Sequence, residues 1–497
     1  MSLSSEGLTL LLLITVVMLC MKQLFSYYKG NKYHLPPGPT PLPIIGNLHL
    51  VGTKRQDLVF MKLAEKYGPI FTFYLGSSPA VVLVGYDVMK EALLNSSYDF
   101  GNRAPVPLID NFQHGQGVFF SNGEIWKTTR RFALSILRDL GMGKSPIEGK
   151  IIEELHYLNE LIRSYNGKPF NQKVFGNAPP NITFGLLFGK RFDYDHPTFR
   201  KIVKNVDDIV ILAGTPEAQF YNVFPILGYI LNTPHVVVKK VEEIQEIMKK
   251  LFVELRESLN ENCWRTYTEA FMLKDQMETN TAENGKIFQE KNLLASMFDI
   301  ILGGTETTAA TIQWGILFLM KYPHIQKKAQ EEIESVIGLE RPPTWDDQKC
   351  LPYCLAMVHE IQRLGNILQF IPHATAADAH FRGYFIPKGT LVIPLLTGVL
   401  YDKTQWATPR EFNPDHFLDS DGKFLKKDAF YPFSKGRRAC AGESLARMEV
   451  FIFIIGLLQK FTFTPPPGVD RSDLDMDAEV CFTLRPKYYN VCAIPRT

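Results

Sequence analysis

The sequence contains few cysteines, and none of them stand in closely spaced pairs. Only seven occur among 497 residues, and no C-x-x-C arrangement is present. Disulfide scaffolds and structural zinc sites depend on several cysteines at short spacings. The sequence therefore indicates neither, and a sparse, odd-numbered set of cysteines suits a reducing environment such as the cytosol.

The sequence also lacks an excess of charge of either sign. It carries 54 basic and 52 acidic residues, which leaves a net charge of +2. Because proteins that bind nucleic acid through its phosphates need a strongly basic surface, we predict no nucleic-acid partner. No internal repeat is visible, and with 45% hydrophobic and 12% aromatic residues the chain has the material for one large core.

An uncharged apolar run opens the chain over residues 7–21. Glu6 precedes this run and Lys22, Lys29 and Lys32 follow it, which by the positive-inside rule places the remainder of the chain in the cytoplasm. Since no A-x-A cleavage site follows, the run is predicted to be retained. We predict a signal-anchor transmembrane segment over 1–29, a basic and proline-rich hinge over 30–50, and one large domain over 51–497.

Hydrophobic periodicity predicts a mainly α fold with small β sheets. Helices are expected over 236–260, 292–321, 324–337 and 443–460, and the polar stretch 274–286 is expected to be an exposed connection. Two hairpins are expected, one from 70–75 and 80–84, the other from 381–386 and 390–393 around a Pro387-Lys388-Gly389 turn.

One cysteine, Cys440, lies in a loop rich in glycine and cations, Phe433-Ser434-Lys435-Gly436-Arg437-Arg438-Ala439-Cys440-Ala441-Gly442. Nearby positive charge and helix-start N–H groups lower the pKa of a thiol and favour the thiolate, which is the form that ligates a metal. A lone cysteine is more often a small buried hydrophobic residue. The loop as a whole favours the ligand.

A second feature is a Gly-Gly pair inside the helix expected over 292–321, in Gly303-Gly304-Thr305-Glu306-Thr307-Thr308. Each interior glycine costs about 1 kcal/mol relative to alanine, so another body is expected to approach the helix there. Thr307 can turn its hydroxyl back on a carbonyl one turn earlier and open a groove. For the glycines alone, close helix packing is the favoured explanation.

The two segments resemble signature motifs of the cytochrome P-450 superfamily. Residues 433–442 match F-x-x-G-x-R-x-C-x-G, and residues 303–308 match [AG]-G-x-[DE]-T-[TS]. The W-x-x-x-R and E-x-x-R motifs are matched at 126–130 and 360–363, whereas the P-x-R-F motif has histidine at position 416. The resemblance covers almost the whole chain, with the spacing of microsomal family two, and implies a cytochrome P-450 fold with a haem-thiolate catalytic domain.

The resemblance assigns roles to particular residues. Cys440 would be the axial ligand of haem iron, Phe433 would shield its sulfur, and Gly442 would let the backbone approach the porphyrin. Thr307 and Glu306 would deliver the protons that let one oxygen atom leave as water. The haem propionates would be held by Arg103, Trp126, Arg130, His373 and Arg438. Glu360 and Arg363 would form a buried structural pair, with His416 as its third member.

The substrate is expected to be lipophilic, since the residues that would line its cavity are nearly all apolar. These are Val118, Phe119, Phe120, Leu302, Gly303, Ile367, Leu368 and Phe482. Core packing explains the same residue types equally well. The conformation of the segment 364–371, which lacks the proline usual in relatives, is left open.

The resemblance implies a monooxygenase that takes electrons from NADPH through NADPH-cytochrome P-450 reductase, with a b-type cytochrome as a further partner. The enzyme would lie in the endoplasmic reticulum membrane with its catalytic domain on the cytosolic face. A reductase-independent isomerase that rearranges peroxides and a haem-based sensor are the alternatives. The apolar stretch 220–231 is expected either to contact the lipid membrane or to cover the core.

Overall fold

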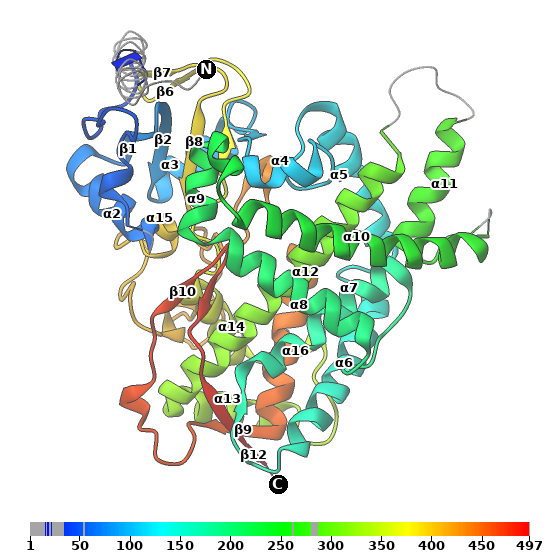
Figure 1. The fold of residues 1–497 in the computed structure, drawn as a ribbon. Coiled ribbons are helices and arrows are strands. Elements are labelled where there is room, and N and C mark those ends of the chain that lie inside the picture. The colour runs from blue at the N-terminus through cyan, green and yellow to red at the C-terminus, as the bar shows by residue number, and fades with distance from the viewer. Residues whose placement is uncertain are drawn as a thin grey trace.

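The computed structural model describes residues 34–52, 55–260, 263–279 and 287–496, with the isolated positions 15, 17, 18 and 21. Helices dominate, as predicted, and the described chain forms one large domain with small sheets (Figure 1). No helix within these described ranges is both long and apolar enough to cross a membrane. The anchor predicted for residues 1–29 lies almost entirely outside the described residues.

The α-helices are α2 (Gln56–Tyr67), α3 (Tyr86–Lys90), α4 (Pro107–Gln113), α5 (Gly123–Asp139), α6 (Ser145–Ser164), α7 (Ala178–Phe188), α8 (Pro197–Ala213), α9 (Pro216–Val223), α10 (Thr233–Glu257), α11 (Tyr267–Thr279), α12 (Glu290–Lys321), α13 (Pro323–Val336), α14 (Pro352–Gly365), α15 (Leu396–Leu400) and α16 (Glu443–Lys460). Short helical turns are η1 (Leu48–Leu50), η2 (Glu91–Asn95), η3 (Gln172–Gly176), η4 (Pro225–Tyr229), η5 (Trp345–Lys349), η6 (Pro414–Phe417), η7 (Gly436–Arg438) and η8 (Arg471–Asp473).

The strands are β1 (Ile70–Leu75), β2 (Ser78–Val84), β3 (Asn102–Arg103), β4 (Phe170–Asn171), β5 (His373–Ala374), β6 (Ala379–Phe381), β7 (Tyr384–Ile386), β8 (Leu391–Leu395), β9 (Phe461–Thr464), β10 (Ala478–Val480), β11 (Leu484–Pro486) and β12 (Asn490–Pro495). The largest sheet has the order β1-β2-β8-β5-β3, and its β1, β2 and β8 lie at the upper left of Figure 1. The predicted hairpin of β1 and β2 is confirmed.

The second predicted hairpin, around residues 387–389, is wrong. Residues 379–386 form a hairpin of their own, because Arg382 and Gly383 both have positive φ, 50° and 84°, and form the turn between β6 and β7. A two-residue turn of this kind matches the right-handed twist of its flanking strands. β8 pairs instead with β2, in parallel, and with β5.

The stretch 274–286 is also not simply a connection, because its first six residues belong to α11. Residues 280–286 lie outside the described ranges. The apolar stretch 220–231 is divided between the end of α9 and η4.

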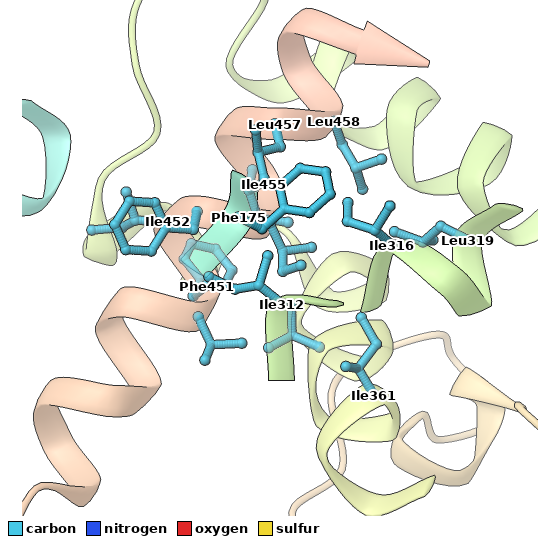
Figure 2. Close-up of a cluster of buried hydrophobic side chains, with 14 of the residues drawn as sticks. Phe175, Ile312, Ile316, Leu319, Ile361, Phe451, Ile452, Ile455, Leu457 and Leu458 are labelled. Atoms are coloured by element: carbon cyan, nitrogen blue, oxygen red, sulfur yellow. The ribbon is translucent and has the colours of Figure 1, made fainter. Parts of the chain in front are cut away.

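The central helix α12 crosses the domain and packs against α7, α14 and α16 (Figure 1). From Val450 to Leu458, α16 is apolar all round, and this part of the helix is completely buried. Figure 2 shows the main core where α12, α14, α16 and η3 meet, with side chains from all four interlocking. Burying one such side chain stabilises the fold by about 1.5–3 kcal/mol, so this core holds α12 and α16 in fixed relation.

The described part of the predicted hinge, residues 34–50, is held against β1. Thr72 donates its hydroxyl to the Pro36 carbonyl at 2.7 Å and its amide to the Pro37 carbonyl at 2.9 Å. A Cβ on Gly38 would lie 1.9 Å from the Thr72 carbonyl oxygen, so only glycine permits this approach. The buried Asn47 side chain accepts from the Tyr74 amide at 2.8 Å.

Candidate active site

Cys440 lies at the end of a tight loop that closes on itself. Its amide donates to the Phe433 carbonyl at 3.0 Å, and the Ala439 amide donates to the Gly436 carbonyl at 3.1 Å. Gly436 has φ +79°, and a Cβ there would lie 1.9 Å from the carbonyl oxygen of Leu93. Glycine is therefore required for both the turn and the contact with η2. Phe433 packs under the Arg447 guanidinium, 5.1 Å from its ring centroid.

The thiol of Cys440 faces an internal space. Its side chain is solvent-accessible, yet burial raises its pKa, while the Gly442 amide and, to a smaller degree, Arg130 lower it. A group that is both accessible and surrounded by protein lines a cavity rather than the outer surface. Gly442 directly precedes α16, so an N–H group at the start of that helix serves the sulfur.

Three guanidinium groups gather beside the loop. Arg103 donates to the Arg438 carbonyl at 3.4 Å, and Arg130 donates to the Ala439 carbonyl at 2.5 Å. Burial and the repulsion of Arg130 lower the pKa of Arg103 to about 9. Burial and repulsion from its neighbouring arginines lower the pKa of Arg438 to about 8. Within the described part of the chain, no acidic side chain pairs with these three arginines.

Buried donors in this cluster have no protein partner. Nη1 of Arg103, Nη1 of Arg438 and Nε1 of Trp126 make no hydrogen bond with any described residue. A buried donor left unpaired costs about 1–3 kcal/mol. The Arg438 guanidinium also stacks 3.6 Å from the Trp126 ring centroid. The cluster therefore fits a ligand that brings two carboxylates, because such a ligand would satisfy the donors and offset the repulsion.

Asn122 orients two of these arginines, and the sequence analysis did not identify it. Its Oδ1 accepts from the Arg438 side chain at 2.7 Å and from the Arg103 amide at 2.8 Å, and its Nδ2 donates to the Arg103 carbonyl at 2.9 Å. An asparagine just before a helix is normally explained as a cap. Only its spacing of four residues before Trp126 could have pointed to this role.

His373, paired with Arg103 across β5 and β3, lies beside the three arginines. Its Nδ1 lies 2.7 Å from the Phe100 carbonyl oxygen, which can only accept, so Nδ1 carries the proton. Burial, followed by the charge of Arg103, lowers the pKa of His373 to about 3. An anionic ligand at this cluster would raise that pKa.

The two glycines of α12 have different surroundings. A Cβ on Gly304 would lie 2.3 Å from the hydroxyl oxygen of Thr183 on α7, so this glycine permits close helix packing. A Cβ on Gly303 would meet no atom within 4 Å, so Gly303 borders open space. Thr307 donates its hydroxyl back to the Gly303 carbonyl at 2.6 Å, as predicted. The open groove therefore lies at Gly303 and Thr307.

Glu306 points away from the Thr307 hydroxyl. Its Oε1 accepts from the Thr483 hydroxyl at 2.7 Å and from Nη2 of Arg485 at 2.9 Å. Burial raises the pKa of Glu306, and Arg485 opposes that rise. Neither Thr483 nor Arg485 was identified from the sequence, because both follow Glu306 by more than 170 residues.

The Thr308 hydroxyl donates to Oε2 of Glu449 at 3.0 Å. This hydrogen bond ties the helix that carries Thr307 to α16, the helix that begins just after the cysteine loop. Burial raises the pKa of Glu449 to about 8. Glu449 was also not identified from the sequence, where it is one acidic residue within an apolar helix.

The predicted structural pair is brought together in the interior. Arg363 makes two hydrogen bonds of 2.7 Å to the carboxylate of Glu360, and both side chains are completely buried. His416 lies with Nδ1 3.1 Å from Glu360 Oε1, while its Nε2 accepts from the Thr408 amide at 3.1 Å. His416 therefore takes part as a neutral donor rather than as a second cation.

The apolar residues expected around the substrate divide into two groups. Phe120, Leu302 and Phe482 line one small cavity. Val118 is buried, Phe119 packs over the Arg103 guanidinium, and Leu368 packs in the core beside β8. The cavity has further walls that were not predicted: Leu108, Ile109, Phe112, Gln113, Ile209, Val210, Ala213, Val237, Phe298 and Asp299.

Asp299 is the only acidic residue on the described walls of this cavity. Its Oδ2 accepts from the amides of Val118 and Phe119 at 2.8 and 2.9 Å, and its Oδ1 accepts from Gln113 at 2.5 Å. Burial raises the pKa of Asp299 to about 6. Asp299 thus attaches the loop 117–119 to α12.

The segment 364–371 has a defined path. Asn366 ends α14 with a left-handed conformation, φ 41°, and donates its side chain to Thr397 at 2.7 Å. The Ile367 carbonyl accepts from the Leu484 amide, and the Gln369 carbonyl accepts from the Leu396 amide, both at 2.8 Å. The segment therefore connects β11 with the start of α15.

The domain is mainly helical, and its accessible cysteine thiol lies beside three arginines that pair with no described acidic side chain. This is the architecture of a haem-thiolate enzyme. The Cytochrome P450 family model matches residues 36–493. The chain belongs to the cytochrome P450 family and is a haem-thiolate monooxygenase. The donor set described above fits the haem that this family uses.

Curated relatives agree over nearly the full length. The chain is 44% identical to mouse cytochrome P450 2W1 over 463 residues, which is 93% of each chain. It is 44% identical to cytochrome P450 2K4 of Oncorhynchus mykiss over 493 residues, 98% of this chain and 97% of the relative. Dog cytochrome P450 2C21 is 40% identical over 488 residues, 97% of this chain and 99% of the relative.

Proposed function

We propose that this protein inserts one oxygen atom of O2 into a lipophilic small molecule, such as a xenobiotic, a fatty acid or a steroid, with electrons from NADPH passed on by a flavoprotein reductase. The observation that carries the proposal is the accessible thiol of Cys440 beside buried arginine donors that have no partner among the described residues. The haem, when bound, supplies the redox chemistry of oxygen activation.

The cysteine loop and the arginines beside it would hold that group. Cys440 would provide the iron ligand, and the Gly442 amide would stabilise its thiolate. Arg103, Arg130 and Arg438 would neutralise the two propionates, and the Trp126 indole, a buried donor without a partner among the described residues, would add a hydrogen bond. Phe433 shields the sulfur, and the buried pair of Glu360 and Arg363 stabilises the fold behind this site.

On the other side of the site, residues of α12 take part in proton delivery and in substrate binding. The Thr307 hydroxyl, held at the Gly303 carbonyl, anchors water at the groove. Glu306, a buried acid that lines a recess on the neighbouring face of the helix, is the source of protons for oxygen insertion. The apolar walls around Phe120, Leu302 and Phe482 exclude bulk water and bind the lipophilic substrate.

The acid and the alcohol of α12 favour a monooxygenase over a peroxide isomerase or a sensor, because neither alternative needs a proton supply. The test is to reconstitute the protein with NADPH-cytochrome P450 reductase and a panel of lipophilic compounds. We expect NADPH consumption matched by a product that has gained one oxygen atom, and a b-type cytochrome should raise the yield. Rearrangement of an organic peroxide without NADPH would favour the isomerase.

We further propose that the protein works at the endoplasmic reticulum membrane, on its cytosolic face, and that the stretch 220–231 contacts the lipid. Ile226, Tyr229 and Ile230 are exposed by 74%, 92% and 78%. Tyr221 is buried and Phe224 packs near Gly76, so these two residues hold the stretch to the domain. Exposed apolar side chains so close together are typical of an interfacial contact.

This contact can be tested in a form of the protein that starts at Lys32. It should still bind phospholipid vesicles, and replacing Ile226, Tyr229 and Ile230 by serine should release it while haem content stays unchanged. The exposed Tyr488, replaced by serine, is the control and should have no effect. Unchanged vesicle binding of the triple variant would refute the contact, and loss of haem would favour a role in the core.

A further inference from the structure

A water-accessible recess of about 930 Å³ borders α12 on the face that carries Glu306. Its walls come from α8, α12, η3 and the strands β10 and β11. Thr305, Glu306, Ala309 and Gln313 represent α12 in this wall, whereas Thr307 is not part of it. Since consecutive helical residues point about 100° apart, Glu306 meets water on a face that Thr307 does not share.

Thr483 and Arg485, two residues of one short segment, hold the Glu306 side chain at this recess by hydrogen bonds. Thr483 directly precedes β11 and Arg485 lies within it, so the two share one face of an extended segment. Both hydrogen bonds end on the same oxygen, Glu306 Oε1, at 2.7 and 2.9 Å. The preceding residue, Phe482, lines the apolar cavity instead.

The same segment is locked to α8, which lines the apolar cavity as well. The Phe482 amide donates to the Val210 carbonyl at 2.9 Å. Nη1 of Arg485 lies 2.5 Å from Oδ1 of Asp207, and Lys173 pairs with the other oxygen of Asp207 at 2.9 Å. Arg485 therefore bridges α8 and α12 through two carboxylates.

We propose that Thr483 and Arg485 are positioning residues for the proton supply: they hold Glu306 at the recess and set its charge, and Asp207 modulates them. This rests on the proposed function, in which Glu306 supplies protons for oxygen insertion. Through Arg485, the carboxylate of Asp207 on α8 is linked to the carboxylate of Glu306 on α12. Because α8 and Phe482 also line the substrate cavity, the segment 482–485 contacts both the substrate cavity and the acid of the proton supply.

Charge determines the direction of each effect. Burial disfavours the Glu306 carboxylate, Arg485 favours it, and Asp207 disfavours it. The other charged groups that line the recess are Lys173, Asp195, Arg200, Lys204 and Glu479. Cys481, beside the same segment, remains a thiol because burial raises its pKa to about 12.

The first test is the pKa of Glu306 itself, measured as the pH midpoint of the carboxyl infrared band that disappears in Glu306→Gln. Arg485→Met removes the favourable charge and should move this midpoint upward. Asp207→Asn removes an unfavourable charge and should move it downward. Thr483→Val removes one hydrogen bond without any charge and should give a smaller upward shift, and it serves in place of Arg485→Met if that variant does not retain haem.

The second test is product formed per NADPH consumed, across pH. In Arg485→Met this ratio should fall several-fold at neutral pH and partly recover as pH rises, whereas Arg485→Lys should lie between it and the wild type. Arg200→Met is the matched control, because Arg200 lines the same recess but contacts the Tyr194 carbonyl rather than Glu306. It should leave both the ratio and the band unchanged.

A double variant separates positioning from a general structural role. When Glu306 is already glutamine, Arg485→Met should cause no further loss of product per NADPH. If the loss is as large as in the single variant, or if Arg485→Met behaves like Arg200→Met, the positioning role is wrong. If Glu306→Gln itself leaves the ratio unchanged, the proton supply through Glu306 is wrong, and that result concerns the proposed function instead.

Discussion

The two sides of the candidate active site are built in different ways. On the cysteine side, the loop 433–442 is closed by its own backbone hydrogen bonds, and its thiol directly precedes α16. On the substrate side, the cavity takes its walls from α4, α8, α10, α12 and the separate residues Phe120 and Phe482. The loop of the first side is closed by backbone hydrogen bonds between residues within ten positions of one another, whereas the walls of the second come from segments spread across most of the chain.

This difference indicates how the two sides respond to change. A closed loop with a required glycine, followed by a helix that is buried from Met448 to Gln459, leaves the thiol little freedom. The substrate side depends on single polar contacts such as that of Asp299 with the loop 117–119. We therefore expect substitutions on the cysteine side to abolish function and those on the substrate side to modify it.

The largest effect is expected for Cys440→Ser. A serine hydroxyl is too weak an acid to replace the thiolate as an electron donor, so monooxygenation should be abolished. The ferrous carbon monoxide spectrum should lose its thiolate form. Cys263→Ser, at an exposed cysteine, is the control and should retain the spectrum. A thiolate-type spectrum in Cys440→Ser would refute the ligand assignment.

Thr307→Ala should have the next largest effect. The change removes the hydroxyl held at the Gly303 carbonyl but no substrate contact, so reducing equivalents should go to peroxide and product per NADPH should fall several-fold. Haem content and substrate affinity should stay the same. Thr311→Ala is the matched control, because its hydroxyl makes the same kind of bond, to the Thr307 carbonyl at 2.8 Å. Equal ratios in the two variants would show that the position of the hydroxyl is unimportant.

Asp299→Asn tests the long-range side of the comparison. A hydrogen bond to a charged acceptor is worth about 1.5–3 kcal/mol and a neutral one about 0.5–1.5, so the loop 117–119 should loosen and substrate affinity should fall several-fold. The carbon monoxide spectrum should not change.

The wild-type protein should approach this weaker affinity as pH falls through about 6, where the buried Asp299 takes up its proton. Optical titration with substrate at pH 5.5 and 7.5 measures this change. Asp110→Asn, at an exposed carboxylate of α4, should leave the pH dependence intact. An Asp299→Asn protein with wild-type affinity at pH 7.5 would contradict the role of the loop attachment.

The smallest effect is expected at Glu449, where the two sides are joined. Its pKa is about 8 in the folded protein and 4.5 without the fold, so between these values the folded chain keeps a proton that the unfolded chain loses. Stability should therefore decrease as pH rises from about 4.5 to 8. Glu449→Gln should flatten this decrease, which denaturant midpoints at pH 6 and 8 would show as a difference of at most a few kcal/mol. The exposed Glu153, changed to glutamine, should not flatten it.

Local sequence was sufficient for several features. The hairpin of β1 and β2, the helix over 292–321 and the helix over 443–460 follow from patterns within one segment, and the structure has them nearly at the predicted residues. The prediction was wrong around residues 381–393. The turn was expected at Gly389 but lies at Gly383, and β8 pairs with β2 instead of forming a hairpin with the preceding strand.

The sequence by itself determined the family, the mainly helical fold and the residues that stand in its motifs, because these depend on short spacings and on local periodicity. Only the tertiary structure decided which way each side chain turns. In the tertiary structure, Gly304 packs against α7 while Gly303 borders open space. Glu306 accepts a hydrogen bond from Arg485, and Asn122 lies between two arginines. The physical reason is that hydrogen bonds and charge pairs act over a few ångströms in space, whereas the partners of Glu306 lie 177 and 179 residues away along the chain.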